Sequence, residues 1–369
     1  MFHIPPYPIC MSANPVFARG RSSRSNASGR FEALSRETVD DGWGEDPLPE
    51  RLETTLTAEK ARVIISRNDS PDIGFDRSIN PYRGCEHGCI YCFARPTHAY
   101  LGLSPGLDFE TKLFFKPDAA ALLEKELGKR GYQPQRIQLG ANTDPYQPIE
   151  RKLMITREIL KVLARHKHPV AITTKNFLVT RDIDILAPMA AENLACVAVS
   201  VTSLDRKLAR AMEPRASTPE RRIEAIRALS AAGVPALVGF APAIPGLNDH
   251  ELEAVLERAA EAGAVSAYFT VLRLPLEIKD LFREWLAAEF PDRAERVMSL
   301  MRQMRGGKEY DAEWGKRMRG EGPVAEMLAQ RMRLARRRFG LDLDRARLAL
   351  DVTKFRKPPE DKRQLELFE

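Results

Sequence analysis

Short runs of apolar residues, many of them β-branched, alternate with amphipathic stretches between residues 77 and 273. The runs cover Arg77–Asn80, Arg136–Ala141, Val170–Lys175, Cys196–Thr202, Ala236–Pro242 and Ala267–Arg273. Continuous apolar runs of this length are typical of strands buried on both faces of a parallel sheet. Because a helix separates each strand from the next, the pattern predicts an α/β fold of about six βα units. The sheet is either open or closed into a barrel.

Two of the intervening helices carry signals at their ends. One has Pro219 near its start and Gly233 just past its end, where these residue types are favoured. The other begins near Asn248 and has Glu251 three residues later, which predicts a variant of the capping box.

Polar segments follow the predicted strands. "NTDPYQPIE" comes after the strand near Leu139, and "TTKN", "SVTS" and "APAIPGLND" come after the next three. In parallel α/β folds the chemistry collects in the loops at the carboxyl ends of the strands. We therefore expect these four loops to converge at one opening, at the carboxyl ends of the strands, which we call the mouth.

The composition divides the chain into four regions. Residues 1–58 are rich in Ser, Arg, Gly and Pro and predict an irregular, partly disordered arm. Residues 59–289 form the predicted core, residues 290–355 a basic helical extension, and residues 356–369 a flexible tail. No run of 18 apolar residues is present and the first residues lack the blocks of a signal peptide, so we expect a cytoplasmic protein and no membrane span.

The formal net charge is +6, and part of the positive charge is concentrated in the extension. Five arginines lie close together there: Arg331, Arg333, Arg336, Arg337 and Arg338. Such a stretch is either a surface that faces phosphates or a solvated helix face, and the absence of interleaved aromatic residues leaves both readings open.

Three of the five cysteines, Cys85, Cys89 and Cys92, lie in the short segment "RGCEHGCIYCFAR". A reducing cytosol disfavours disulfides, so the group indicates metal or redox chemistry. A structural zinc site needs four ligands, and His87 is too close to the flanking cysteines to complete a tetrahedron comfortably. A [4Fe–4S] cluster held by three thiolates keeps one iron open for an external ligand.

The spacing C-x3-C-x2-C, with Tyr91 before the last cysteine and βα repeats behind it, resembles the signature of radical S-adenosylmethionine (SAM) enzymes. The resemblance implies a partial (β/α)6 TIM-like barrel with a C-terminal helical extension. It also implies that Cys85, Cys89 and Cys92 hold a [4Fe–4S] cluster whose open iron binds SAM. Reductive cleavage of SAM would then yield a 5′-deoxyadenosyl radical that abstracts hydrogen from a substrate, the protein fixing geometry and excluding solvent.

Residues 62–341 resemble one branch of that superfamily, the spore photoproduct lyase-related group often labelled DNA repair photolyases. The segments that carry this likeness include "NPYRGCEHGCIYCFARPTHAY", "NTDPYQPIE", "TTKN" and "GKRMRGEGP". The branch implies that Tyr91 lies beside the adenine of SAM and that Thr143 and Asp144 hold its amino group.

The same resemblance assigns Lys175 and Ser200 to the carboxylate and ribose of SAM, and the backbone of Ala243 and Ile244 to the adenine. One position departs from the lyase. Where the lyase returns hydrogen through a cysteine, this chain has Ala141, so repair of that particular lesion is not expected. Cys196 begins a strand, and we interpret it as a buried structural thiol.

The chain ends in a segment that resembles the pentapeptide that binds the bacterial sliding clamp. Its defining residues are Gln364, Leu365, Leu367 and Phe368, which follow the polar stretch "RKPPEDKR". Apolar residues on a polar tether are costly to expose unless a partner covers them. The alternative is that the tail folds back onto the core.

Together these patterns predict a radical SAM enzyme that acts on nucleic acid, plausibly in DNA repair or modification. An electron donor such as flavodoxin or ferredoxin would reduce its cluster. Two alternatives stay open: a radical SAM enzyme acting on a protein or small metabolite, and a non-catalytic, zinc-stabilised clamp adaptor.

Overall fold

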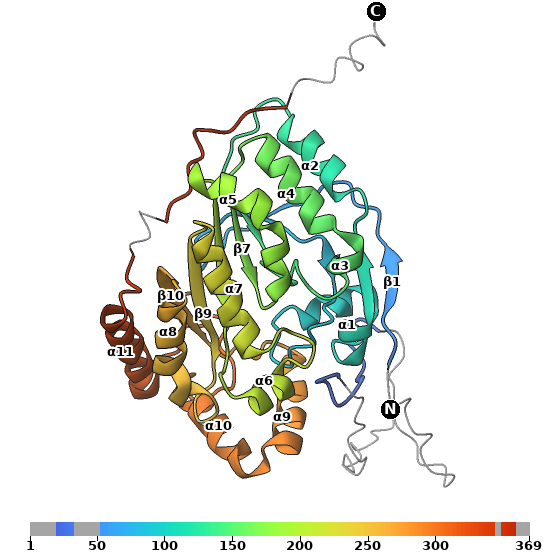
Figure 1. Ribbon diagram of the computed structural model, residues 1–369. Coiled ribbons are helices and arrows are strands. Elements are labelled where there is room, and N and C mark those ends of the chain that lie inside the picture. The colour runs from blue at the N-terminus through green and yellow to red at the C-terminus, as the bar shows by residue number, and fades with distance from the viewer. Residues whose placement is uncertain (1–19, 33–51, 344–347, 359–369) are drawn as a thin grey trace, which may run out of the picture.

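The computed structural model describes residues 20–32, 52–343 and 348–358. Its main sheet has seven strands in the order β10–β9–β8–β7–β6–β3–β2 (Figure 1). The strands are β2 Ile65–Arg67, β3 Arg77–Ile79, β6 Ile137–Leu139, β7 Val170–Thr174, β8 Ala195–Ser200, β9 Ala236–Ala243 and β10 Ser266–Val271. All neighbours are parallel except β2 and β3.

The six strands predicted from the sequence are the six parallel strands β3 and β6 to β10, and they lie side by side in chain order. This confirms the α/β fold of successive βα units, with the strand order of a partial barrel. Their apolar residues are buried because helices cover one face and the strands curve around the other. Val197 and Val199, for example, are fully buried.

Five helices pack against the outer face of this sheet: α2 Ala119–Leu127, α4 Ile155–Arg165, α5 Ile183–Ala191, α7 Pro219–Ala231 and α8 Leu252–Glu261. The predicted ends of α7 are confirmed, because Thr218 caps its first turn and Gly233 has a φ of 76°. The predicted capping box of α8 is wrong. The Asn248 amide and the Glu251 carboxylate instead bind backbone groups of neighbouring loops, such as Ile244 N–H and Leu204 N–H.

A second, smaller sheet has the order β1–β5–β4, with strands β1 Thr55–Ala58, β5 Lys112–Phe115 and β4 Tyr82–Arg83. Two short helices, η1 Arg95–Leu101 and α1 Leu107–Thr111, lie in the chain between β4 and β5. This sheet lies beside the carboxyl end of β3 and carries the segment that contains the three clustered cysteines. Strand β1 falls at the end of the predicted N-terminal arm.

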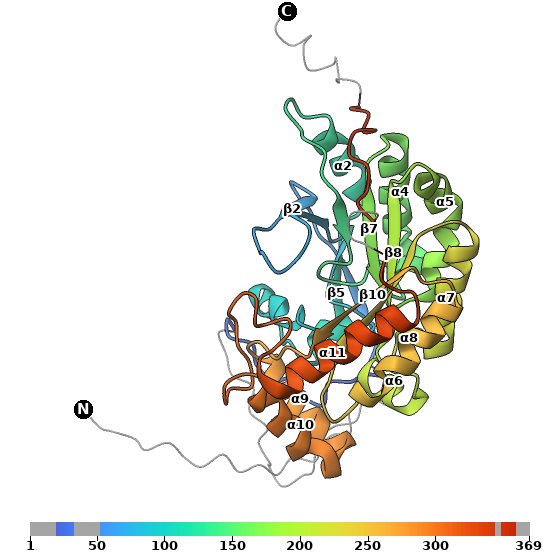
Figure 2. The same ribbon diagram turned by 90° about the vertical axis from the view of Figure 1, so that its left-hand side faces the viewer.

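The C-terminal part consists of α9 Ile278–Glu289, α10 Pro291–Gln303 and α11 Gly322–Arg338. Helix α11 packs along α8 and β10 (Figure 2), and Arg331 forms an ion pair with Glu253 of α8 at 2.5 Å. Arg336 binds the carbonyl of Leu341 beyond the end of the helix. Two of the five clustered arginines therefore have structural partners, while Arg333, Arg337 and Arg338 are exposed.

Residues 305–320, which we call the edge loop, connect the two ends of the main sheet. Met318 accepts a hydrogen bond from the backbone of Val271 in β10. The guanidinium of Arg317 pairs with Asp72, and Gly315 N–H donates to the same carboxylate at 2.6 Å. Since Asp72 lies in the connection between β2 and β3, the edge loop spans both edge strands.

Residues 348–358 run past the amino ends of β7 and β8. Arg356 N–H donates to His166 and Asp351 N–H to Asn193, the turns that precede those two strands. In Figure 1 this dark red segment lies at the top, whereas α6 Arg206–Met212 and α9 lie at the bottom. Among the described residues, none of the helices has the length and apolar character that a membrane crossing requires.

Candidate functional site

The cysteine loop, residues 84–94, joins β4 to η1 and is fixed by backbone hydrogen bonds. Cys85 N–H donates to Phe109 and Ile90 N–H to Met212, each at 3.0 Å. Gly84 has a φ of 74°, and a Cβ at this position would lie 2.9 Å from the carbonyl oxygen of Phe109. Glycine is therefore required for the loop to approach α1 so closely.

Two residues of the cysteine loop, Cys85 and Cys89, are buried, and Cys92 is partly buried. Cys85 and Cys89 are 5% and 7% exposed, and burial raises the pKa of all three thiols. Buried thiolates need a cation to balance them. In the part of the chain that the structure describes, no three His, Cys, Asp or Glu side chains converge so as to hold a single metal ion. The thiol ligands of an iron–sulfur cluster bind different irons, so the loop fits a cluster better than a lone zinc.

Lys175 and Ser200 meet next to the cysteine loop. Lys175 Nζ donates to Ser200 Oγ at 2.7 Å and lies 5.7 Å from the centre of the Tyr91 ring. Burial lowers the pKa of the Lys175 ammonium. The structure thus brings together three of the residues that the sequence predicted around SAM, from β8, from the end of β7 and from the cysteine loop.

Two polar atoms at this place have no hydrogen-bond partner among the described residues. They are the Tyr91 hydroxyl and Glu213 Oε1, both buried. Glu213 Oε1 lies 3.7 Å from Lys175 Nζ, beyond hydrogen-bond distance. Buried polar groups are nearly always paired. These two unpaired atoms, next to the buried Lys175 ammonium, could form hydrogen bonds with a small polar ligand such as SAM.

The loop after β6 contains the predicted Thr143 and Asp144. Thr143 donates its hydroxyl to the carbonyl of Tyr82 at 2.9 Å, which ties this loop to the strand before the cysteines. Asp144 accepts hydrogen bonds from Thr174 Oγ1 at 2.8 Å and from Lys175 N–H at 2.7 Å. Burial alone would raise the pKa of Asp144, but the His87 ring and two backbone N–H groups outweigh burial and hold this pKa below its usual value.

His87 turns away from the thiols. Its Nδ1 lies 3.3 Å from Asp144 Oδ2, and its Nε2 lies 3.1 Å from the Asn176 amide. The ring therefore connects the cysteine loop to the loops after β6 and β7.

Ala243 and Ile244 lie at the end of β9 and are fully buried. Ile244 N–H donates to Asn248 Oδ1 at 2.7 Å, and its carbonyl accepts from Leu247 N–H. The described contacts thus use both backbone groups of Ile244. The carbonyl of Ala243 is also in use, because it accepts from Leu272 N–H at 3.0 Å.

Sequence reasoning missed a buried ion pair under the site. Arg222 of α7 contacts Glu213, and both side chains are almost completely inaccessible. A second nitrogen of Arg222 donates to the carbonyl of Ser200 at 3.1 Å. Arg222 therefore neutralises Glu213 and positions the end of β8. Glu213 lies in the sequence "EPR" that follows α6. This sequence gives no local sign of the ion pair, because the partner Arg222 comes from the next helix.

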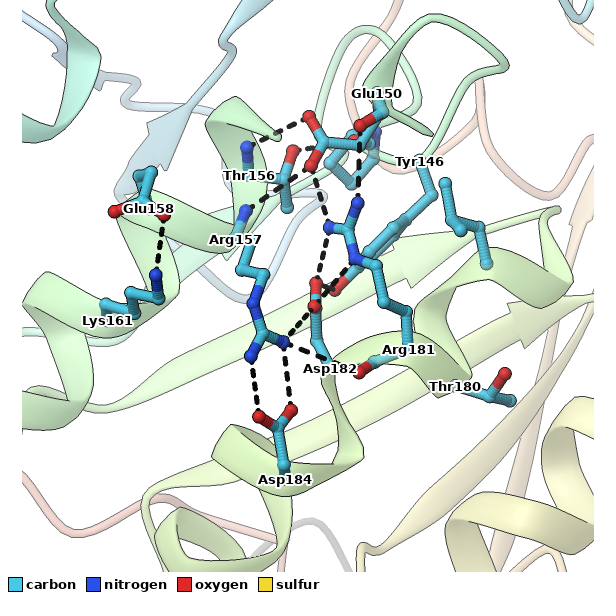
Figure 3. Close-up of polar contacts among 12 residues, drawn as sticks. Tyr146, Glu150, Thr156, Arg157, Glu158, Lys161, Thr180, Arg181, Asp182 and Asp184 are labelled. Carbon is cyan, nitrogen blue, oxygen red and sulfur yellow. Dashed lines mark hydrogen bonds and ion pairs between the residues drawn. The ribbon is translucent and has the colours of Figure 1, made fainter. Parts of the chain in front are cut away.

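A polar network lies behind the loop after β6 (Figure 3). Its two fully buried carboxylates, Glu150 and Asp182, share the guanidinium of Arg181, with 2.8 Å contacts to each. Tyr82 donates to Glu150, and Tyr146 donates to Asp182 at 3.1 Å. Because Tyr82 lies two residues before the cysteine loop, this network anchors that loop to α3 Glu150–Leu153 and η2 Phe177–Asp182.

Two residues are relevant to the step in which a hydrogen atom would be returned to the substrate. Ala141, which stands where the lyase has its cysteine, lies in the loop after β6. Cys196 is on the same face of β8 as Ser200 but four residues nearer the amino end, about 13 Å along the strand. Burial raises its pKa to about 11, as expected for an inert buried thiol.

A partial barrel of parallel strands, with three buried thiols in a loop at the carboxyl end of its first strand, defines the radical SAM class of proteins. The comparisons agree. The model of the Radical SAM superfamily matches residues 79–259. The chain belongs to this superfamily, whose members use a [4Fe–4S] cluster and S-adenosylmethionine.

Among its relatives is an uncharacterized protein of Mycobacterium tuberculosis (strain ATCC 25618 / H37Rv). It is 38% identical over 230 residues, which cover 62% of this chain and 68% of the relative. An uncharacterized protein of Methanocaldococcus jannaschii is 26% identical over 238 residues, 64% of this chain and 85% of that one. The fold is also similar to that of a spore photoproduct lyase complexed with dinucleoside spore photoproduct, with a TM-score of 0.54, 17% identity and coverage of 77% of this chain and 79% of the lyase.

Proposed function

We propose that this radical SAM enzyme acts on nucleic acid, in DNA repair or modification. Cys85, Cys89 and Cys92 would hold the cluster. The residues proposed to bind SAM are Tyr91, Thr143, Asp144, Lys175, Ser200, Ala243 and Ile244. When bound, the reduced cluster and SAM supply a hydrogen-abstracting radical, and the chain's own residues hold SAM, exclude water and orient the substrate.

The choice of nucleic acid rests on one arrangement at the mouth, formed by Arg273 and Phe93. The guanidinium of Arg273, just past the end of β10, lies 5.1 Å from the centre of the Phe93 ring. Phe93 directly follows Cys92 and is 45% exposed. Arg273 Nε is buried without a hydrogen-bond partner, and no carboxylate of the described residues forms an ion pair with this guanidinium.

The Arg273 guanidinium donates to Met318 Sδ at 2.9 Å but pairs with no carboxylate of the described residues, so beside an exposed aromatic ring it offers a phosphate contact and a stacking face together. The relation in fold to a lyase that was solved with a dinucleoside lesion supports this reading. Ala141 argues for a different lesion or modified nucleotide, because the side chain that the lyase uses to return hydrogen is missing here.

The remaining assignments are part of the same proposal. The tail residues Gln364, Leu365, Leu367 and Phe368 would bind a sliding clamp, and they lie outside the described residues. A flavodoxin or ferredoxin would supply electrons in the cytoplasm. We keep the division into an arm (1–58), a core (59–289), a helical extension (290–355) and a tail (356–369) as the working description of the chain.

Titration of a fluorescently labelled single-stranded oligonucleotide tests the nucleic-acid proposal. We expect Arg273→Ala or Phe93→Ala to weaken binding by about tenfold, since a phosphate or stacking contact is worth roughly 1–3 kcal/mol. Arg258→Ala, an exposed arginine of α8, removes the same charge and serves as the control. Equal losses for Arg273→Ala and Arg258→Ala, or no loss for Arg273→Ala, would show that the mouth does not bind nucleic acid.

Activity provides an independent readout. The reconstituted, reduced enzyme should release more 5′-deoxyadenosine when a lesion-bearing oligonucleotide is present than when it is absent. Stimulation by a peptide or small metabolite instead would assign the enzyme to a different substrate class.

A further inference from the structure

Residues 20–32, which we call the N-terminal strap, pack against the cysteine loop. The sequence placed them in an irregular arm, and they form no helix or strand. Even so, Arg21, Ser22 and Ser23 are only 6%, 2% and 1% exposed. A segment without regular structure that is buried to this degree needs specific partners for its polar groups.

Several of those partners belong to the cysteine loop. Ser22 Oγ donates to the carbonyl of Gly88 and accepts from Arg95 Nη2 at 3.2 Å. Arg95 also donates to Gly88 O at 3.1 Å and to Cys89 O at 2.9 Å. Ser22 and Arg95 thus hold two successive carbonyls between the first and third cysteines.

Glu110 is the second anchor of the strap. Its carboxylate lies 2.5 Å from Arg95, and both side chains are completely buried. Ser22 N–H and Ser23 N–H donate to this carboxylate at 3.2 and 3.0 Å, and Arg21 donates to the Glu110 carbonyl at 2.7 Å. Without the strap, a buried carboxylate would lose two donors, which is costly in an apolar environment.

The rest of the strap is attached to the first helix of the C-terminal part. Arg30 pairs with Glu277 at 2.6 Å, immediately before α9, and Ser25 Oγ donates to Glu284 at 2.8 Å. Arg24 pairs with Glu289 at the end of the same helix. The strap therefore crosses from the cysteine loop to α9 and is fixed at both ends.

We propose that the N-terminal strap is an integral part of the cluster site, which fixes the cysteine loop and limits the access of small molecules to its thiols, with Ser22 as the positioning residue. This inference rests on the proposed ligand role of Cys85, Cys89 and Cys92. It does not depend on the identity of the substrate.

The test compares Ser22→Ala with Ser23→Ala in the full chain. Both serines are buried, but among the described residues the Ser23 hydroxyl donates to the Ser25 carbonyl, within the strap. Cluster-free protein is treated with an aromatic disulfide reagent, and peptide mapping separates labelling of the three loop cysteines from that of Cys10 and Cys196. We expect Ser22→Ala to speed labelling of the loop cysteines by about fivefold, the effect of one lost hydrogen bond on local opening. Ser23→Ala should label like the unmodified sequence.

The cluster-loaded protein gives a parallel readout, because a ferrous chelator should strip iron faster from Ser22→Ala than from Ser23→Ala. Equal labelling and iron loss in the two variants would overturn the proposal. If Ser22→Ala does not fold, amide hydrogen exchange of the unsubstituted chain decides. The amides of Ser22, Ser23, Cys85 and Ile90 should then be protected together, and rapid exchange of the two serines alone would contradict the inference. None of these measurements uses SAM or nucleic acid, so their failure is separate from failure of the proposed substrate.

Discussion

Lys175 Nζ donates a 2.7 Å hydrogen bond to Ser200 Oγ and thereby joins the end of β8 to the residue that follows β7. Both side chains also lie within reach of the Ala241 carbonyl on β9, at 3.4 Å from Lys175 and 3.1 Å from Ser200. One ammonium group therefore links three neighbouring strands beneath the cysteine loop. It is a fixed positive charge where a carboxylate ligand would be held.

Replacing Lys175 by Met keeps much of the side-chain volume and removes the charge. We expect the affinity for SAM to fall about tenfold, since a charge-assisted hydrogen bond to a carboxylate would be lost. The measurement is equilibrium binding of SAM to the oxidised, cluster-loaded enzyme without oxygen. Lys161→Met, on the exposed face of α4, is the control. Identical affinities in the two variants would remove Lys175 from the proposed site.

His168 predicts a pH dependence of stability. It is fully buried, its Nδ1–H donates to the Pro169 carbonyl at 3.1 Å, and its Nε2 accepts a 2.8 Å hydrogen bond from the Tyr132 hydroxyl. Burial lowers its pKa to about 4. Between about pH 6.5 and 4 the unfolded chain binds a proton that the folded chain does not, so stability is present above pH 6.5 and is lost as the pH falls through this window. The full effect is about 3 kcal/mol.

Urea unfolding at pH 7.5, 6 and 5 checks this expectation. In His168→Gln the fall in unfolding free energy between pH 7.5 and 5 should be smaller than in the unsubstituted chain. The exposed His250→Gln variant should retain the original slope. A slope that is unchanged in His168→Gln would assign the acid sensitivity to other groups.

We expect the tail to bring the enzyme to a sliding clamp and to take no part in catalysis. Residues 348–358 cross the amino ends of β7 and β8, opposite the cysteine loop. Leu367→Ala with Phe368→Ala should therefore abolish binding to a sliding clamp, because the motif would lose its apolar anchors. The rate of SAM cleavage should not change. Surface-immobilised clamp and a 5′-deoxyadenosine assay give the two readouts, and undiminished clamp binding would count against the motif.

The six parallel strands of the main sheet could be predicted because each one has a local signal, whereas the short antiparallel strand β2 was missed. The run Val170–Lys175, for example, became β7 Val170–Thr174, and the polar residues directly after it lie at the mouth. Asn248 and Glu251 show where local signals fail. Their spacing fits a cap, yet their side chains bind neighbouring loops instead, because tertiary contacts override local propensity.

The parts of the site that sequence could not predict depend on contacts between distant residues. Ser22 N–H and the Glu110 carboxylate are 88 positions apart, and no periodicity relates them. Glu213 and Arg222 are only nine positions apart, but a turn separates their helices. Composition marked residues 20–32 as irregular, which is correct for their backbone and uninformative about their burial.

The pairing of Arg317 with Asp72 has a steric consequence for any long substrate. The ion pair joins the two edges of the main sheet, so the edge loop would obstruct a polymer that approached the site from this side. If the substrate is DNA, as proposed, a strand would have to lie across the rim and flip a single nucleotide toward the three cysteines. Reactivity would then depend on how easily that nucleotide leaves its stack, which favours damaged, mismatched or unpaired positions over intact duplex.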